Sequence, residues 1–376
     1  MKNIIFIIAF IFLELIVAKG QKTITKIIVD SETGMPISGA HVYKSDNLRT
    51  GTITNVDGKF VLKQIKENDI VNISHISYLT FTKPVNKIMS DTIKLLKKTF
   101  NLDEVIIHAA TGKTIMQKVI DSLYSNHFVE PVMYKVYVQV SQFEKDHSEL
   151  HVLSEYLMNV YQNKKHKSEI QMIKTRAKPF SEAGKKYFKD MRIIPAIAIV
   201  SDNIFRFKND IFKKKKLKNF EIIIEKNNNE KNNLIKLVCK PKKENEYTRI
   251  VLFIDKSSYA VCKMIKYYSE SEEEFKEIGF KEVNNKWYLD YSNLKIYSDF
   301  FSKWKPNSNS TLERKVIYNI NDNILYDSKI FKTAFNLVAE PIKYHIGNWS
   351  DKFWENYNYI PLPNWIKEKI EESNSR

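Results

Sequence analysis

The sequence is poor in cysteine, glycine and arginine for a chain of 376 residues. Its two cysteines cannot build a disulfide framework, which excludes a small fold stapled by several bridges. After residue 20 no apolar run reaches the roughly 18 residues of a membrane-spanning helix, and the nearest, residues 193–204, is too short. The hydrophobic fraction of 43% and the aromatic fraction of 12% are too high for a disordered chain. We therefore expect two or three folded domains with sizeable cores.

The scarcity of arginine changes the interpretation of the charge. A formal net charge of +16 is typical of proteins that bind nucleic acid. Arginine occurs only seven times, however, and the other 53 basic residues are lysine. Arginine is the usual reader of base edges and of phosphate in bidentate geometry. Together with abundant Asn, Ile and Tyr, the lysines indicate a low-GC coding bias, so we expect no nucleic-acid partner.

The first twenty residues have the layout of a secretory signal peptide. Lys2 gives a positive start, an apolar run broken only by Glu14 follows, and Ala18 and Gly20 are small residues before a cleavage point at Gln21. The alternative is an uncleaved membrane anchor, but the run of about 15 residues is short for that role. We therefore predict residues 1–20 to be a signal peptide and the mature chain to be exported.

A short lysine run bears on whether the exported chain touches a membrane. Lys213–Lys216 places four consecutive positive charges in an expected loop. Such runs are usually solvated, and that is the interpretation we favour. The alternative is contact with acidic lipid headgroups. The mature protein is thus expected to be soluble or peripherally attached to a membrane.

The few glycines are clustered, and the cluster marks a turn-rich region. Four of the nine glycines are Gly34, Gly39, Gly51 and Gly58. Between them, β-rich segments recur about every ten residues with polar turns, and Asp57-Gly58 is the strongest hairpin signal in the chain. This spacing predicts an all-β sandwich in the first hundred residues.

The residues of this region resemble the carboxypeptidase regulatory-like domain, a transthyretin-type sandwich. The family pattern is D-x-x-T-G-x-P-x-x-G-A-x-V, then G-T-x-T-D-x-x-G-x-F-x-L, then S-x-x-G-Y. Two positions depart from it: Asn55 stands where Asp is usual, and Ser77 stands where Gly is usual. The resemblance implies a seven-stranded, prealbumin-like sandwich over residues 21–107 that serves as an interaction module. The matching residues are Asp30, Thr33, Gly34, Pro36, Gly39, Ala40, Val42, Gly51, Thr52, Thr54, Gly58, Phe60, Leu62, Ser74 and Tyr78.

Two activities associated with this kind of sandwich are not expected. A zinc carboxypeptidase needs an H-x-x-E pair and a distant histidine; His127 and Glu130 have that spacing, but His345 is the only far downstream histidine and Pro131 follows the glutamate. In those peptidases the sandwich also follows the catalytic domain. A TonB-dependent receptor needs a barrel of 22 strands and a plug, for which the remaining residues are too few.

Residues 108–376 are expected to form a helix followed by a curved antiparallel sheet with a few short helices. The run from Ala110 to Thr114 lacks the glycine that a phosphate-binding loop needs at position 107, so it predicts a plain helix start, with the helix ending near Ser125. Alternating segments then predict strands, five of them in a meander over residues 233–297. The expected strands cover 133–143, 149–161, 234–240, 248–255, 260–268, 275–283 and 287–297.

The second half also resembles lipoprotein-carrier-like half-barrels of the Gram-negative envelope. Residues 250–261 are similar to an I-D-K-x-x-x-x-V hairpin of those proteins, and residues 353–358 to a W-x-x-Y-N stretch of uncharacterised envelope relatives. The segment 102–107 is similar to the L-x-E-V-V-V run that follows the sandwich in such proteins. A short amphipathic helix is expected around residues 364–372. The resemblance implies a half-barrel-like domain with an aromatic tail over residues 108–376.

Residues 147–151 are the only cluster with the spacing of metal ligands. On a strand, His147, Glu149 and His151 would face one way, but Glu149 is misplaced for an H-E-x-x-H zinc motif. A turn entering a strand is the interpretation we favour. Cys239 and Cys262 fall on the first and third strands of the meander, about 9.5 Å apart, so both are predicted to be reduced. No catalytic residue, metal site or cofactor is predicted.

The sequence therefore predicts a mainly β, non-enzymatic, exported protein of the cell envelope, located in the periplasm or at the outer membrane. Its function is predicted to be that of a binding or scaffold module, whose partner is an envelope protein or an apolar or lipid ligand. The alternative is a periplasmic carrier of lipid or lipoprotein acyl chains in the concave face of the half-barrel. A hydrolase is disfavoured because no nucleophile–base pair or G-x-S-x-G elbow can be identified.

Overall fold

The computed structural model has two compact units. The first comprises Met1–Lys97 with Ser350–Pro363, and the second Lys98–Trp349 with Asn364–Arg376. The predicted signal segment, residues 1–20, and His345 lie outside the described residues. The described residues are 22–45, 47–75, 78–97, 111–127, 130–163, 168–190, 210–225, 234–243, 248–298, 305, 307–320, 327, 329, 332–333, 353–354 and 360–374.

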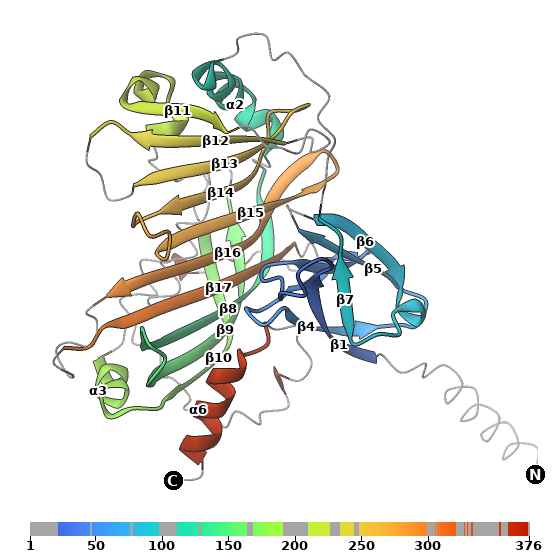
Figure 1. Ribbon diagram of the computed structural model, residues 1–376, viewed down its shortest axis with the longest axis vertical. Coiled ribbons are helices and arrows are strands. Elements are labelled where there is room, and N and C mark those ends of the chain that lie inside the picture. The colour runs from blue at the N-terminus through green and yellow to red at the C-terminus, as the bar shows by residue number, and fades with distance from the viewer. Residues whose placement is uncertain are drawn as a thin grey trace, which may run out of the picture. The chain divides into compact units, whose positions relative to one another are not determined.

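The first unit is a sandwich of a three-stranded and a four-stranded sheet, which confirms the predicted seven-stranded β-sandwich (Figure 1). The strand orders are β4-β1-β7 and β3-β2-β5-β6, and the 3₁₀ turn Val85–Lys87 precedes β7. Apolar side chains that alternate along the strands meet between the sheets, as in Phe60, Leu62 and Ile73, which are fully buried. The strands are β1 Lys22–Asp30, β2 His41–Lys44, β3 Asn47–Ile53, β4 Lys59–Ile65, β5 Ile70–His75, β6 Tyr78–Pro84 and β7 Thr92–Leu95.

The family-pattern residues Asp30 and Tyr78 tie turns of the sandwich together. Asp30 accepts hydrogen bonds from the backbone N–H groups of Glu32 and Thr33, both at 2.9 Å, and from the Tyr78 hydroxyl at 2.8 Å. Lys97 adds an ion pair at 3.1 Å. The backbone hydrogen bond from Thr33 is the largest cause that holds the pKa of Asp30 far below its usual value. The motif residues therefore act by closing turns, which needs no ligand.

Gly58 shows why the predicted Asp57-Gly58 turn requires glycine. Its φ is +70°, and its N–H donates to the carbonyl of Asn55 at 3.0 Å. A Cβ at this position would lie 2.4 Å from the carbonyl oxygen of Ile28. Both the backbone conformation and the close approach of β1 therefore exclude a side chain here.

The second unit is built on one open, antiparallel sheet of eleven strands (Figure 1). The order is β11-β12-β13-β14-β15-β16-β17-β8-β9-β10-β18, so the chain leaves β10, restarts at the far edge and returns to pair β17 with β8. This confirms the predicted mainly β class and the antiparallel meander. The strands are β8 Val132–Glu144, β9 Leu150–Gln162, β10 Ser168–Pro179, β11 Phe220–Glu225, β12 Leu234–Pro241, β13 Arg249–Asp255, β14 Val261–Tyr267, β15 Phe275–Val283, β16 Lys286–Ser298, β17 Ser310–Ile320 and β18 Lys332–Thr333.

Three α-helices of the described residues accompany this sheet. Helix α2, Gly112–Asn126, is the predicted helix: Thr111 caps it by accepting from the Thr114 N–H, and Ile115, Met116, Val119 and Leu123 are buried. Helix α3 is Glu182–Asp190 and α6 is Asn364–Asn374. The lysine run expected in a loop instead enters the 3₁₀ helix Lys214–Asn219, which follows the 3₁₀ turn Asp210–Phe212. No helix among the described residues combines the length and the apolar character needed to cross a bilayer.

The cysteines occupy the predicted strands. Cys239 lies on β12 and Cys262 on β14, with β13 between them. Two strand steps of about 4.8 Å separate them, which is beyond the Cα separation of a disulfide. Cys239 is fully buried, and burial raises the pKa of its thiol to about 12, whereas Cys262 is partly exposed.

This difference predicts selective alkylation. Iodoacetamide at neutral pH should label Cys262 and leave Cys239 unlabelled until the protein is unfolded, because only an accessible thiolate reacts. Peptide mass spectrometry of native and unfolded samples measures both sites. A disulfide between the two cysteines would lower the mass of the non-reduced protein by two hydrogens. Detection of that mass difference would contradict the separation of the two cysteines.

His127 makes the stability of the second unit depend on pH. It ends α2, is 2% exposed and packs edge-on against Phe280 with ring centroids 4.9 Å apart. Burial lowers its pKa from 6.5 to about 3. In the unfolded chain His127 therefore takes up a proton near pH 6.5, while in the folded chain its ring stays neutral at that pH.

We expect the free energy of unfolding to be highest above pH 6.5 and to fall as the pH is lowered towards 3, by as much as about 5 kcal/mol from this group. Urea unfolding at a series of pH values measures the slope. The variant His127→Phe keeps a ring against Phe280 and should lose this part of the slope. An unchanged slope in the variant would show that His127 is not the cause.

Candidate functional site

The β8–β9 hairpin gathers the titratable residues that the sequence singled out. Glu144 is the last residue of β8, and Glu149 precedes β9, whose second residue is His151. The Glu144 N–H donates to the Glu149 carbonyl at 2.9 Å, which closes the turn. His147 does not join the others. Its ring stacks on that of Trp365 in α6, with centroids 4.4 Å apart and planes 3° from parallel.

His151 is fully buried and bonded on both ring nitrogens. Its Nδ1 lies 2.8 Å from Ser181 Oγ, and its Nε2 lies 3.1 Å from Glu144 Oε1. Ser181 Oγ also accepts the Gly184 N–H at 2.9 Å, at the start of α3. A carboxylate only accepts, so we assign the proton to Nε2 and let the Ser181 hydroxyl donate to Nδ1. Burial is the main cause that lowers the pKa of His151, which keeps the ring neutral.

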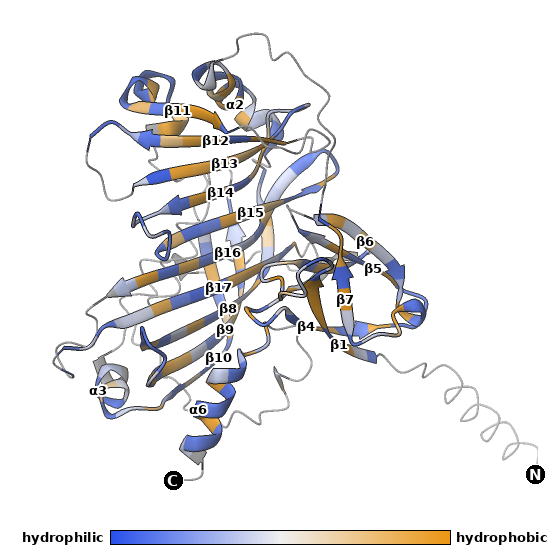
Figure 2. Cartoon of the chain, viewed as in Figure 1, coloured by the Kyte–Doolittle hydropathy of each residue, from blue (hydrophilic) through white to orange (hydrophobic). Residues whose placement is uncertain are grey.

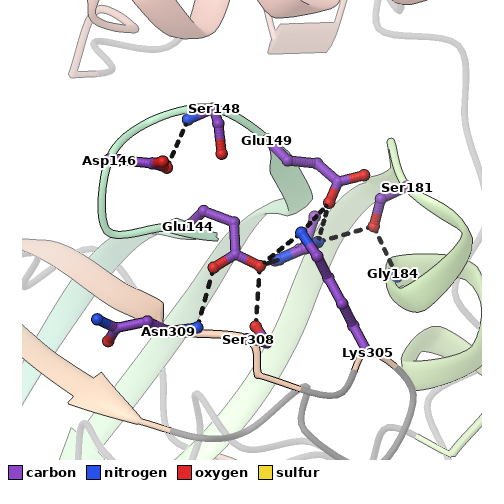
Figure 3. Close-up of polar contacts among 10 residues, drawn as sticks. Glu144, Asp146, Ser148, Glu149, Ser181, Gly184, Lys305, Ser308 and Asn309 are labelled. Atoms are coloured by element: carbon purple, nitrogen blue, oxygen red, sulfur yellow. Dashed lines mark hydrogen bonds and ion pairs between the residues drawn. The ribbon is translucent and has the colours of Figure 1, made fainter.

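Lys305 lies between the two carboxylates (Figure 3). Its Nζ is 2.8 Å from Glu144 Oε1 and 2.8 Å from Glu149 Oε2. Glu144 also accepts from the Ser308 hydroxyl at 2.9 Å and from the Asn309 N–H at 3.0 Å. Burial would raise the pKa of Glu144, but the hydrogen bonds from Lys305, Ser308, His151 and Asn309 hold it below its usual value.

The donor set of this cluster fits a metal ion, but a lysine ammonium already pairs with both of its carboxylates. One ligand atom each from Glu144, Glu149 and His151 lies within 4.8 Å of the others. Histidine and carboxylate are ligands that Zn²⁺ takes. The Lys305 ammonium, however, reaches both carboxylates, and a divalent ion there would face that positive charge. The arrangement therefore accommodates an internal ammonium group between the two carboxylates.

A polar pocket of about 580 Å³ opens beside this cluster. Its walls carry charges of both signs and amide groups, so it suits water or a small polar molecule rather than an acyl chain. Lys145 on its wall pairs with Glu273 at 3.0 Å. The lining residues are Glu144, Lys145, Asp146, Ser148, Lys305, Asn307 and Asn309.

Sequence reasoning missed Glu144, Ser181 and Lys305. Glu144 is seven residues before His151 and meets it only because a hairpin turn reverses the chain. Lys305 is 156 residues from Glu149, and no spacing rule connects them. The one sequence signal for this pair was the spacing of seven residues between Glu144 and His151 across a predicted hairpin. Of the pair with peptidase spacing, His127 is buried against Phe280, whereas Glu130 is exposed.

A second candidate site is the apolar face of the eleven-stranded sheet. The strand registers align one residue from each of nine neighbouring strands, β11 to β9, in a single row. Only one of the nine is polar, Ser292, which accepts a hydrogen bond from Arg314 at 3.2 Å. Figure 2 shows the alternating hydropathy of these strands. The row is Ile224, Leu237, Leu252, Met264, Ile278, Ser292, Val316, Val138 and Tyr156.

Helix α2 packs its apolar stripe into the core on this face. At its first residue a Cβ on Gly112 would lie 2.4 Å from the carbonyl oxygen of Ile222 in β11. Polar contacts to the β13–β14 turn hold its middle and its last residue. Lys118 Nζ donates to the Tyr259 hydroxyl at 3.0 Å, and Asn126 Nδ2 donates to the Ser258 carbonyl at 2.6 Å. The helix thus covers an apolar surface and is attached at its ends.

A comparison with protein families supports the first of the two resemblances. Residues 26–107 match the model of the CarboxypepD_reg-like domain, which confirms the resemblance of the sandwich. No curated protein matches the chain.

Three solved structures are similar to 57–60% of this chain. A DUF1329 family protein from Desulfovibrio piger has 11% identity and a TM-score of 0.25, with 97% of its chain covered. A putative outer membrane lipoprotein-sorting protein domain from Vibrio parahaemolyticus has 10% identity and a TM-score of 0.27, with 95% of its chain covered. A LolA superfamily protein from Nitrosomonas europaea has 12% identity and a TM-score of 0.25, with 100% of its chain covered.

Replacement of Lys305 tests the balance of charge in the cluster. In Lys305→Met the two carboxylates lose their shared cation, so we expect a loss of about 1–2 kcal/mol of stability and a new stabilisation by Zn²⁺. Thermal unfolding with and without the ion measures both. The control Lys145→Met, whose partner is Glu273, should gain no response to zinc. A zinc response in the unaltered protein would refute the assignment of Lys305 as the resident cation.

Proposed function

We propose that this chain is an exported, non-enzymatic binding protein of the cell envelope that carries an apolar ligand of the acyl-chain class on its large sheet. The observation that carries the proposal is the register row of nine residues, eight of them apolar, across an open sheet. Eight of the nine residues are fully buried, and side chains of α2 belong to the same core. A ligand would therefore reach this face by displacing part of the protein that covers it. The predicted signal segment supports export to the periplasm or the outer membrane.

The binding energies of the cover and of an acyl chain are comparable. Helix α2 buries Ile115, Met116, Val119 and Leu123, at about 1.5–3 kcal/mol each, or about 6–12 kcal/mol in all. An acyl chain of about fourteen methylenes buried on the same face gains about 11 kcal/mol at about 0.8 kcal/mol each. The two burial terms are therefore of similar size before the cost of ligand association is subtracted, which suits a carrier that must load and release its cargo.

The attachments of α2 favour its displacement as a unit. Its polar contacts reach the β13–β14 turn, Lys286 Nζ donates to the Ser125 carbonyl, and Asp121 pairs with Lys214 of the 3₁₀ helix. Polar contacts to water-accessible groups are exchanged for water at a small net cost, near 1 kcal/mol each. The helix can thus leave the sheet without breaking a strand pairing.

The chemistry of the polar cluster supports a role without catalysis. Ser181, the hydroxyl nearest to His151, serves as the N-terminal cap of α3. The carboxylate that would orient the histidine, Glu144, shares an ion pair with Lys305. These groups stabilise the end of the β8–β9 hairpin, and Ser181 is 6% exposed. A nucleophile needs access to substrate that this serine does not have.

The proposal is tested by lipid binding with a variant that loosens α2. Gly112→Ala places a methyl group against the Ile222 carbonyl, so α2 should pack less tightly on β11. We expect faster uptake of a fluorescent fatty acid by this variant than by the unaltered protein, by about tenfold. The control Lys113→Ala, an exposed position on the same turn, should leave the rate unchanged.

Native extraction provides an independent measurement. Protein purified from its host without detergent should release acyl lipid into organic solvent, as detected by mass spectrometry. Circular dichroism checks that the unaltered protein and the Gly112→Ala variant are both folded. If both are folded, neither takes up the probe and no lipid is recovered, the carrier function is wrong.

A further inference from the structure

The departure of Asn55 from the family pattern has a structural consequence in the first unit. Its Oδ1 accepts from the N–H groups of Asp57 at 3.0 Å and Lys59 at 2.9 Å, which is the work that an aspartate does in this turn. Only an amide adds a donor. The Nδ2 group of Asn55 lies 3.2 Å from the carbonyl oxygen of Pro361, 3.4 Å from that of Leu362 and 3.4 Å from Asp57 Oδ2.

A second donor of the sandwich reaches the same segment of chain. Lys63 on β4 donates from Nζ to the carbonyl oxygen of Trp354 at 3.1 Å, although Lys63 is only 7% exposed. Asn55 is fully buried, and so is Ile360, while Trp354 is 3% exposed. Residues 350–363 accordingly group with the sandwich in one compact unit. Two buried side chains of the sandwich therefore donate hydrogen bonds to main-chain carbonyls of one segment.

The bound segment is suited to this mode of recognition by its prolines. Ile360 and Leu362 each precede a proline, which restricts both to extended backbone, and Pro361 and Pro363 fix their own φ near −65°. Residues 360–363 have no regular secondary structure in the fold. Because proline lacks an N–H, the segment cannot pair fully in a strand ladder, and the carbonyls of Pro361 and Leu362 accept from a side chain instead. An extended segment of this kind loses little entropy when it is bound.

We propose that the sandwich is a peptide-binding module whose ligand is an extended, proline-containing strand recognised through its main-chain carbonyls, and that residues 360–363 fill this site from within the same chain. Asn55 is the residue that determines specificity, because a carboxylate there would oppose two carbonyl oxygens. This site is independent of the apolar face of the second unit and of the ligand proposed for it.

The first experiment uses the full chain with Asn55→Asp. The carboxylate still accepts from Asp57 N–H and Lys59 N–H, so the turn should survive, but the donor to Pro361 and Leu362 is lost. We expect cleavage within residues 353–363 by chymotrypsin to accelerate at least about tenfold, with hydrogen exchange of β1 and β4 unchanged. The matched control Asn72→Asp alters an amide elsewhere on the sandwich, bonded to Ser45 and Thr82, and should not release the segment.

Lys63→Met gives a second measurement that leaves the turn untouched. This variant should also accelerate cleavage within residues 353–363, because it removes the donor to the Trp354 carbonyl. If neither variant accelerates cleavage within residues 353–363 while the sandwich keeps its protection, the proposal is wrong.

The site itself is tested by supplying its ligand from outside. In the full chain with Ile360→Asp, a charge at a buried position should expel the internal segment. A fluorescent synthetic peptide with the sequence of residues 350–363 should then bind to this variant and not to the unaltered protein. The double variant Ile360→Asp with Asn55→Asp should bind it at least about tenfold more weakly. Absence of binding to Ile360→Asp, or equal binding to the double variant, overturns the proposal.

Discussion

The pairing of β17 with β8 is the constraint on which the second unit depends. Eleven residues of each strand are in register, from Ser310 opposite Glu144 to Ile320 opposite Tyr134. This pairing joins the β8–β9–β10 hairpins to the β11–β17 meander, which would otherwise be two small sheets. The apolar row crosses the junction at Val316 and Val138, so burial of that face depends on it. A slip of one residue would turn Val316 to the other face.

The same register builds the polar cluster at the end of the sheet. Because Ser310 lies opposite Glu144, the residues just before β17 are delivered to the carboxylate, and Ser308, Asn309 and Lys305 bond to it. The buried His151 then has a hydrogen-bond partner on each ring nitrogen, Glu144 on one side and Ser181 on the other. Each buried polar group in this cluster is bonded to another, which is the condition for polar groups at the end of an apolar layer.

The first unit shows how one amide can serve two purposes. The turn at Asn55–Gly58 needs an acceptor, and either aspartate or asparagine supplies it. The donor of asparagine is surplus to the turn, and in this chain it meets the carbonyls of Pro361 and Leu362. The predicted division placed all of residues 108–376 in one domain, whereas residues 350–363 group with the sandwich. The predicted boundaries at residues 20 and 107 lie outside the described residues and stay predictions.

Local chemistry in the sequence determined the class of fold and most elements. Glycines at 34, 39 and 58 adopt positive φ, which is why their cluster located the sandwich, and alternation with period two located the strands of the meander. The apolar spacing of Ile115, Val119 and Leu123 located α2. Only the tertiary structure decided that β17 pairs with β8, that Lys305 balances Glu144 and Glu149, and that Asn55 binds residues 361 and 362. The reason is physical: turns and periodicity involve near neighbours, while these contacts join residues more than 150 positions apart through strand register and packing.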